Sequence, residues 1–175
     1  MPTIVIPTAT AQQVLATQGA LVIDLRTPAE FAQDHLPRAL NVPLFDDVQR
    51  ALIGRLYTKA SPQSAFEAGQ ALVHERVDTL VDDIARATHW RARGADKHAE
   101  VERLTHGGIA VMDAALEPRP LEQLPRDAVV LHCWRGGLRS RSVIALVRSL
   151  GLERAVGLAG GYKRYRAHIV ERTAS

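Results

Sequence analysis

The sequence predicts an α/β fold in which a mostly parallel sheet lies between two layers of helices. Two apolar runs, LVIDL at residues 21–25 and AVVLHC at residues 128–133, have the pattern of strands that are buried on both faces. Segments of strand character alternate with helical segments along the chain, which implies parallel strands joined by helices. A length of 175 residues, 46% of them hydrophobic and 23% charged, suits one globular domain. We therefore expect a single domain over residues 1–175.

The elements around the first apolar run follow from helix-capping signals. Thr27 is a natural N-cap, Pro28 suits the first helical position, and Glu30 completes a capping box. A short helix is therefore expected after the strand, ending near residues 35–37. Thr8 or Thr10 is a candidate cap for a helix at residues 9–17. Strands are expected at residues 3–6, before this helix, and at residues 39–42.

The middle of the chain, residues 46–90, is predicted to be helical. Apolar side chains recur there at helical spacing and form one stripe: Val73, Val77, Leu80, Val81 and Ile84. Residues 91–108 are highly charged, and two alternatives stay open for them, a helix ending at Gly107–Gly108 or a mobile excursion. A strand is expected at residues 109–112 and a proline-rich loop at residues 118–125. The segment 91–120 is expected to be an insertion.

The last part of the chain continues the alternation of strands and helices. A helix is predicted over residues 139–150, and Gly151 suits the position just after its end. A strand is expected at residues 155–158. Gly160 and Gly161 then allow a turn into a last helix over residues 162–172.

Composition excludes several classes of protein. The single cysteine, Cys133, cannot form an internal disulfide, which fits a reducing compartment. The Cys and His residues lack the spacing of a structural zinc site, and we expect neither a metal nor a cofactor. No apolar run is long enough to span a membrane, and no secretory signal opens the chain. We therefore expect a cytoplasmic protein without a membrane partner.

Charge is distributed unevenly along the chain. Residues 1–132 carry 13 Lys and Arg against 17 Asp and Glu, a net charge of −4. Residues 133–175 carry 9 against 2, a net charge of +7. A basic segment can attract phosphate groups, including those of nucleic acid. The alternative is an ordinary solvated surface whose arginines pair with acids elsewhere.

The stretch HCWRGGLRS, residues 132–140, combines the features of an anion-binding loop with a nucleophile. A strand delivers Cys133 to its carboxyl end, where open α/β sheets bind ligands. Gly136 and Gly137 let the backbone direct its N–H groups inward, and the start of a helix adds further free N–H groups. Such surroundings stabilise the thiolate, which is the nucleophilic form of cysteine. The alternative is a buried core thiol, since free cysteine is often buried.

The substrate side of this loop is predicted to consist of its backbone amides and two arginines. Arg135 and Arg139 add positive charge beside Cys133. Asp24, at the carboxyl end of its strand, and Arg141 are expected to shape the mouth of the site. The anion-binding residues are therefore expected to be Trp134, Arg135, Gly136, Gly137, Leu138, Arg139, Asp24 and Arg141.

Other polar and aromatic residues near the loop have structural interpretations. Arg26 and Glu30 are close enough in sequence to form an ion pair. His132 points away from Cys133 in a strand and is expected to be packed. Trp134 either packs over the loop or stacks on a base.

These motifs resemble a known family. LVIDLRTPAEF with DHLPRALNVPL resembles the first half of a rhodanese domain, and VVLHCWRGGLRS with LGLERAVGLAGGYKRYR resembles its second half. CWRGGLRSRS, GGYKRYR and NVPLFDDVQRALIGRLYTKASPQSAFEAGQALV are similar to the rhodanese domain of bacterial tRNA 2-selenouridine synthases. The resemblance implies a rhodanese-like three-layer sandwich and covers roughly residues 20–90 and 125–170.

The resemblance also implies a chemistry. Cys133 would carry sulfur or selenium as a persulfide-like group, and the loop amides would stabilise its anionic forms. The family replaces sulfur by selenium in a thiolated uridine of tRNA, with selenophosphate as donor and a geranylated intermediate. The implied partners are a small donor of the thiosulfate or selenophosphate class, tRNA, and a P-loop subunit on a separate chain. Such a subunit is implied because G-x-x-x-x-G-K-[ST] does not occur in this sequence, which leaves a split protein and a stand-alone rhodanese as alternatives.

Two further functions stay open. Five residues separate Cys133 from Arg139, a spacing shared with rhodanese-fold phosphatases, and a loop of this width can surround a tetrahedral oxyanion. The basic segment also suits a module that binds tRNA or a partner without chemistry of its own.

Overall fold

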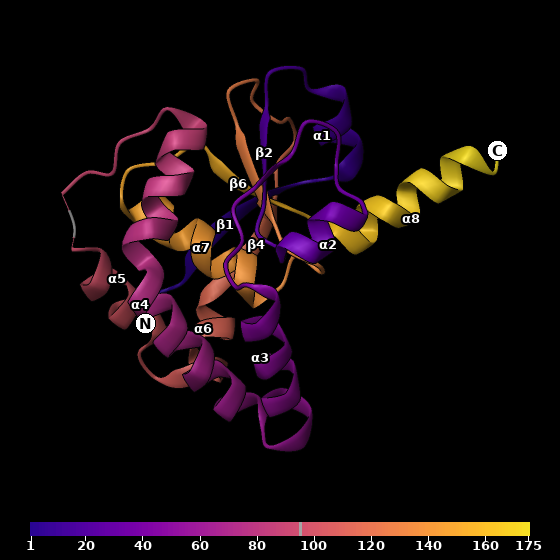
Figure 1. Ribbon diagram of the computed structural model, residues 1–175. Helices are drawn as coiled ribbons and strands as arrows, with labels where there is room; N and C mark the ends of the chain where they lie inside the picture. The colour runs from indigo at the N-terminus through magenta and orange to yellow at the C-terminus, as the bar shows by residue number, and fades with distance from the viewer. Residues whose placement is uncertain (95) are drawn as a thin grey trace.

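A computed structural model describes residues 1–94 and 96–175 and confirms the α/β class. Six parallel strands form one sheet in the order β3-β2-β5-β6-β1-β4, and helices cover both of its faces (Figure 1). The strands are β1 (Ile4–Ala9), β2 (Leu21–Asp24), β3 (Leu40–Asn41), β4 (Leu116–Pro120), β5 (Val129–His132) and β6 (Ala155–Leu158). The helices are α1 (Ala11–Ala16), α2 (Pro28–Gln33), α3 (Asp47–Lys59), α4 (Pro62–Thr88), α5 (Lys97–Thr105), α6 (Gly108–Ala115), α7 (Leu138–Ser149) and α8 (Gly161–Thr173).

The two helical layers differ in size. Helices α3 to α7 pack over one face of the sheet, and α1, α2 and α8 pack over the other (Figure 1). Strand β5 shows how the sheet serves both layers, because Val129 and Leu131 join the larger core while Val130 joins the smaller one. Fully buried strands of this kind read as continuous apolar runs, which is why the sequence located β2 and β5 correctly. No helix in the described residues is both long and apolar enough to cross a bilayer.

The capping signals produce the helix starts that they predict. Thr27 accepts the N–H of Glu30, and the Glu30 carboxylate accepts the N–H of Thr27. Thr10, one of the two candidate caps, makes the same reciprocal pair with Gln13. The strand before it is longer than predicted, since β1 continues to Ala9.

Two predictions in the middle of the chain are wrong. Residues 109–112, expected as a strand, lie inside α6, because a short apolar run fits either structure and here Met112 packs as part of a helix. Residues 118–120, expected as loop, belong to β4, which pairs with β1 at the edge of the sheet. An edge strand tolerates proline because one side of its backbone needs no partner in the sheet.

Of the two alternatives for residues 91–108, the helix is confirmed for α5, which spans Lys97–Thr105. Val101 and Leu104 of α5 are buried in the larger core together with Met112 and Leu116. The helix ends at Thr105, two residues before Gly107, and Gly107 and Gly108 both have positive φ angles, 90° and 82°. The segment 91–120 therefore supplies core side chains and an edge strand. Its origin as an insertion stays a prediction.

Candidate functional site

The site is positioned by the strand–loop–helix unit that contains Cys133. Strand β5 lies between β2 and β6 in the sheet and ends at His132, so Cys133 stands at the carboxyl edge of the sheet. The loop that follows turns into α7 at Leu138, and Gly137 is the N-cap without any side-chain cap. The first N–H groups of α7 are therefore free to face an anion held by the loop.

The loop is held from its outer side by the beginning of α8. The N–H of Tyr162 donates to the carbonyl oxygen of Cys133 (3.0 Å), and the N–H of Lys163 donates to that of Trp134 (2.8 Å). Gly136 and Gly161 meet where the two segments touch. Both have positive φ angles, 66° and 61°, and a Cβ on Gly161 would lie 2.5 Å from the nitrogen of Gly136. Only glycine fits at either position.

The surroundings of Cys133 favour its thiolate. The side chain is buried, and burial alone raises the pKa of a thiol. The positive charge of Arg139, the hydroxyl of Ser140 and the backbone N–H groups of Ser140 and Gly137 outweigh burial, so the pKa of Cys133 lies below its ordinary value. Sγ of Cys133 is 3.2 Å from Oγ of Ser140. The sequence did not single out Ser140, although it directly follows Arg139.

Cys133 lies at the wall of a large, mainly apolar cavity of about 570 Å³ between the helices of the larger layer. Its polar end carries Arg135 and Arg139, as predicted, and also Arg50 of α3. Arg50 and Arg139 both line this cavity, and burial together with the charge of Arg139 lowers the pKa of Arg50. Sequence reasoning missed Arg50 because it lies some 80 positions before Cys133, and only the return of α3 brings it to the loop.

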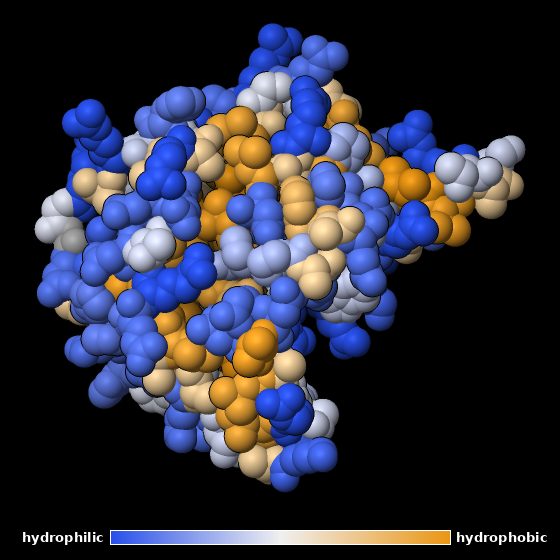
Figure 2. Space-filling model, in the orientation of Figure 1, coloured by the Kyte–Doolittle hydropathy of each residue, from blue (hydrophilic) through white to orange (hydrophobic). Residues whose placement is uncertain are grey.

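Apolar side chains from five helices, α3 to α7, and from the loop before α3 form the rest of the cavity. These walls include Phe45, Ile53, Phe66, Val73, Val101, Leu104, Met112 and Leu138. Carboxylates and imidazoles are missing from the lining, as far as residues 1–94 and 96–175 are concerned. Three large hydrophobic or aromatic side chains of α3 are exposed as well: Val48, Leu52 and Tyr57. Figure 2 shows hydrophobic surface in the lower part of the view, where α3 lies in Figure 1.

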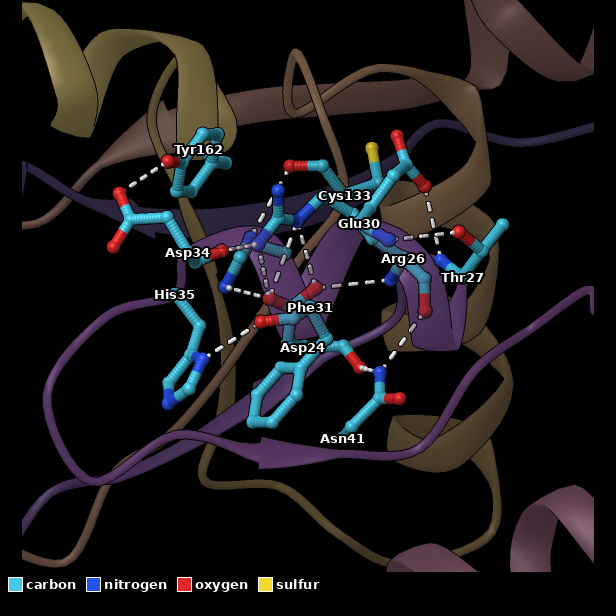
Figure 3. A network of polar contacts seen from close by, with 11 residues as sticks. Asp24, Arg26, Thr27, Glu30, Phe31, Asp34, His35, Asn41, Cys133 and Tyr162 are labelled. Atoms are coloured by element: carbon cyan, nitrogen blue, oxygen red, sulfur yellow. Dashed lines mark hydrogen bonds and ion pairs between the residues drawn. The ribbon is translucent and has the colours of Figure 1, made fainter. Parts of the chain in front are cut away.

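Asp24 does not shape the mouth of this cavity. Its carboxylate is fully buried and accepts three hydrogen bonds from the side chain of Arg26, at 2.7 to 3.2 Å (Figure 3). The predicted ion pair between Arg26 and Glu30 is therefore wrong, because Glu30 caps α2 instead. His132 is fully buried, as expected, with Nε2 at 3.7 Å from the carboxylate of Asp24. Burial lowers the pKa of His132.

Arg141 and Trp134 also lie away from the cavity. The guanidinium of Arg141 binds the carboxylate of Asp113 (2.5 Å) and the carbonyl oxygen of Leu116 (2.6 Å), so it ties α7 to the end of α6. Trp134 is 36% exposed, and its ring lies 5.5 Å from the ring of Tyr162. Its side chain lines a second hollow.

This second hollow, of about 440 Å³, lies on the other side of the cysteine loop and is mainly polar. It is lined by Arg26, Glu30, Gln33, Asp34, Trp134, Tyr162 and Arg166. The guanidinium carbon of Arg26 lies 3.8 Å from the ring centre of Tyr162, and the hydroxyl of Tyr162 donates to Asp34 (Figure 3). In the described part of the chain, no cluster of three or more potential ligands could hold a metal ion.

Comparisons with known proteins identify a family and several relatives for this chain. Residues 8–79 match the rhodanese-like domain family. The chain is 31% identical over 159 residues to the tRNA 2-selenouridine synthase of Cronobacter sakazakii, which covers 91% of this chain and 33% of that protein. The chain is 30% identical to the tRNA 2-selenouridine synthase of Cupriavidus necator, and this match covers 91% of this chain and 34% of that protein. This chain thus spans about a third of the length of these relatives.

A solved structure shares the fold over nearly the whole chain. It is the N-terminal domain of a protein from Clostridium difficile 630 that is described as ATP/GTP-binding. The two chains are 26% identical with a TM-score of 0.64, and the match covers 93% of this chain and 98% of that one.

Proposed function

Because this chain is a rhodanese-like domain, we propose that it is a sulfur or selenium transferase that acts in the conversion of 2-thiouridine to 2-selenouridine in tRNA. The observation that carries this proposal is the environment of Cys133. A thiol whose pKa is lowered by Arg139 and Ser140 lies beside a cavity with three guanidinium groups, those of Arg50, Arg135 and Arg139. The similarity to tRNA 2-selenouridine synthases supports the tRNA part of the proposal.

The transfer takes place in two steps on Cys133. With thiosulfate as donor, the thiolate attacks the outer sulfur and forms a new S–S bond, while sulfite leaves with the electron pair of the old one. The resulting persulfide is stabilised as an anion by Arg139, Ser140 and the loop N–H groups. Attack by cyanide on the terminal sulfur then gives thiocyanate and restores the thiolate. Sulfite leaves as a stable anion, so no acid is needed in the cavity.

The experiment is sulfur loading followed by transfer. Wild-type protein exposed to thiosulfate should gain the mass of one sulfur atom on Cys133 and should transfer it to cyanide. Cys133→Ser should do neither, and Arg50→Gln should lower the rate because one of the three cations is lost. A wild-type protein that gains no sulfur, or turns over no faster than Cys133→Ser, would overturn the proposal.

The apolar cavity supports a further part of the proposal, the geranylated intermediate that the resemblance implies. Anionic groups would bind at the arginines, and a geranyl chain would lie against the apolar walls. Gly69 of α4 faces this space, where an added Cβ would make ordinary contacts with Phe45 (3.6 Å) and Ile53 (3.8 Å). Gly69→Leu should therefore fill the cavity and weaken binding of geranyl diphosphate, measured by calorimetry, about tenfold or more.

A matched control lies on the same helix. Ala71 of α4 is exposed and does not line the cavity, so Ala71→Leu adds a similar side chain outside it. Equal affinities in wild type and Gly69→Leu would exclude the cavity as the site of the geranyl chain.

Phosphatase activity is the second candidate, favoured by the five residues between Cys133 and Arg139 and by the contact of Ser140 with Sγ. Phosphate ester hydrolysis by cysteine normally needs an acid that protonates the leaving oxygen. The described lining residues include no carboxylate or imidazole, which favours sulfur transfer. Hydrolysis of an aryl phosphate that depends on both Cys133 and Arg139 would reverse this ranking.

The third candidate is a module that works with a P-loop partner. The relatives are about three times as long as this chain, and the similar solved structure is a domain of a protein described as ATP/GTP-binding. If a neighbouring gene encodes a P-loop protein without a rhodanese domain, the two purified chains should elute together in size-exclusion chromatography. Separate elution at micromolar concentration would exclude a stable complex.

A further inference from the structure

Trp134 combines exposure with a fixed position directly after the nucleophile. Its backbone is held by the N–H of Lys163, and its indole lies at 5.5 Å and 33° to the ring of Tyr162. It nevertheless remains 36% exposed, although Cys133 on one side of it in the chain is buried. A side chain that only covered the loop would bury its surface, whereas Trp134 presents a rigid aromatic surface to the solvent.

The hollow beside Trp134 has the composition of a site for a polar aromatic ring. Its volume of about 440 Å³ falls within the range of small-molecule sites, which is roughly 300–1,000 Å³. Tyr162 and the guanidinium of Arg26 stack with each other on one wall. The two carboxylates of the hollow are already engaged, Asp34 by the hydroxyl of Tyr162 and Glu30 by the N–H of Thr27.

Arg166 lines the hollow, and four further cations lie near it in the cysteine loop and in the first turns of α7 and α8. In residues 1–94 and 96–175, five cations near the loop form no ion pair: Arg135, Arg139, Lys163, Arg164 and Arg166. Four of them are exposed, and only Arg139 is partly buried. Arg135 directly follows Trp134 in the cysteine loop, Arg139 is in the first turn of α7, and the other three cations belong to α8. Solvent-facing cations of this kind can track a chain of phosphates.

We propose that the second hollow binds a nucleotide of the acceptor RNA, with its base stacked on Trp134 and its flanking phosphates on the cations of α8. The proposal rests on the proposed function, since it names how that function holds its acceptor RNA at the cysteine loop. Base stacking on an aromatic side chain is sequence-tolerant and strong enough to change affinity about tenfold or more. Arg26 and Tyr162 are buried and support Trp134 from within the protein, and Arg166 is the exposed cation of the lining.

The probe is an anticodon stem-loop RNA that carries one 2-thiouridine. Trp90→Phe leaves Trp134 as the only tryptophan, and its fluorescence should be quenched when the RNA binds. Trp134→Ala should bind the RNA about tenfold or more weakly than wild type, whereas Trp134→Phe should keep most of the affinity because a ring remains. Absence of quenching, or an unchanged affinity in Trp134→Ala, overturns the proposal.

The charge part of the proposal has its own matched control. Lys163→Gln with Arg166→Gln should weaken RNA binding at low salt and make its salt dependence shallower, by about 0.7 in the logarithmic slope per lost phosphate contact. Arg126→Gln removes an exposed cation from the loop before β5, at the opposite edge of the sheet, and should change neither. An equal effect of both changes would mean that net charge alone attracts the RNA.

Failure of this proposal and failure of the proposed function give different results. If Cys133 takes up sulfur but Trp134→Ala binds RNA as wild type does, only the stacking site is excluded. If Cys133 takes up no sulfur while the RNA quenches Trp134, the hollow binds RNA in a protein without transfer chemistry.

Discussion

At the scale of the residue, two opposing effects act on the pKa of the Cys133 thiol, burial and the positive groups around it. Burial opposes the thiolate, and Arg139 makes the largest contribution in its favour, followed by Ser140 and the loop N–H groups. The result is a thiol that ionises more readily than an ordinary cysteine although it is almost inaccessible. Burial therefore does not by itself make Cys133 an unreactive core thiol, because its surroundings favour the thiolate.

The lowered pKa of Cys133 predicts how the alkylation of this thiol depends on pH. Because only the thiolate reacts, the rate with iodoacetamide should rise with pH, with its midpoint below the value of about 8.5 for a free thiol. Arg139→Gln removes the largest favourable charge and should move the midpoint upward, whereas Arg126→Gln at the far edge of the sheet should leave it in place. A lower alkylation midpoint in Arg139→Gln than in the wild type would contradict the role of Arg139 in stabilising the thiolate.

At the scale of the element, the two glycines of the cysteine loop have different tasks. Gly136 has a φ of 66°, and a Cβ there would lie 2.9 Å from the carbonyl oxygen of Leu158. Gly136→Ala should therefore lower the free energy of unfolding by about 1–3 kcal/mol and reduce sulfur transfer. Gly137 has a φ of −85° and open space around a Cβ, so Gly137→Ala should change stability by less than about 0.5 kcal/mol.

Urea unfolding of both variants, together with the transfer assay, checks this difference. Equal stabilities of the two variants would mean that the packing of the loop against α8 does not constrain Gly136.

The elements that could be predicted from sequence are those whose signals are local. The apolar runs of β2 and β5, and the capping boxes of α1 and α2, depend only on neighbouring residues. In contrast, β4 was taken for a loop because prolines argue against a strand unless its place at the sheet edge is known. The partner of Arg26 was also missed, since both Asp24 and Glu30 lie within reach along the chain.

The residues of the candidate site, like the elements of the fold, could be predicted only where the signal lies in one short stretch of sequence. Cys133, Arg135, Arg139 and the two loop glycines lie in one continuous stretch. All of them line the same cavity except Gly136, which packs against the start of α8. Arg50 comes from a distant helix and could not be found by spacing. Arg141 carries the charge of a site residue, but its partner Asp113 comes from α6, whose position the sequence did not indicate.

At the scale of the whole molecule, the segment from α5 to β4 behaves as part of the core. Leu116 is fully buried at the start of β4, so Leu116→Ala should lower the free energy of unfolding by about 2–5 kcal/mol. Val111 of α6 is 41% exposed, and Val111→Ala should change the free energy of unfolding by less than about 0.5 kcal/mol.

Both variants and the wild type should unfold in one cooperative urea transition if the chain is a single domain. A separate early transition that alone responds to Leu116→Ala would show that this segment folds independently of the rest.

The attachment of the cysteine loop to α8 also affects which sequence changes the protein can tolerate. The two bonds from α8 use the backbone N–H groups of Tyr162 and Lys163, which every residue except proline possesses. The exposed side chains in the first turn of α8, Lys163 and Arg164, can therefore diverge to suit a new acceptor while the thiolate stays in register. Gly136, Gly160 and Gly161 are constrained by their positive φ angles and close contacts, and Tyr162 by its burial. The scaffold of the chemistry and the surface that selects the substrate can thus evolve separately along the same helix.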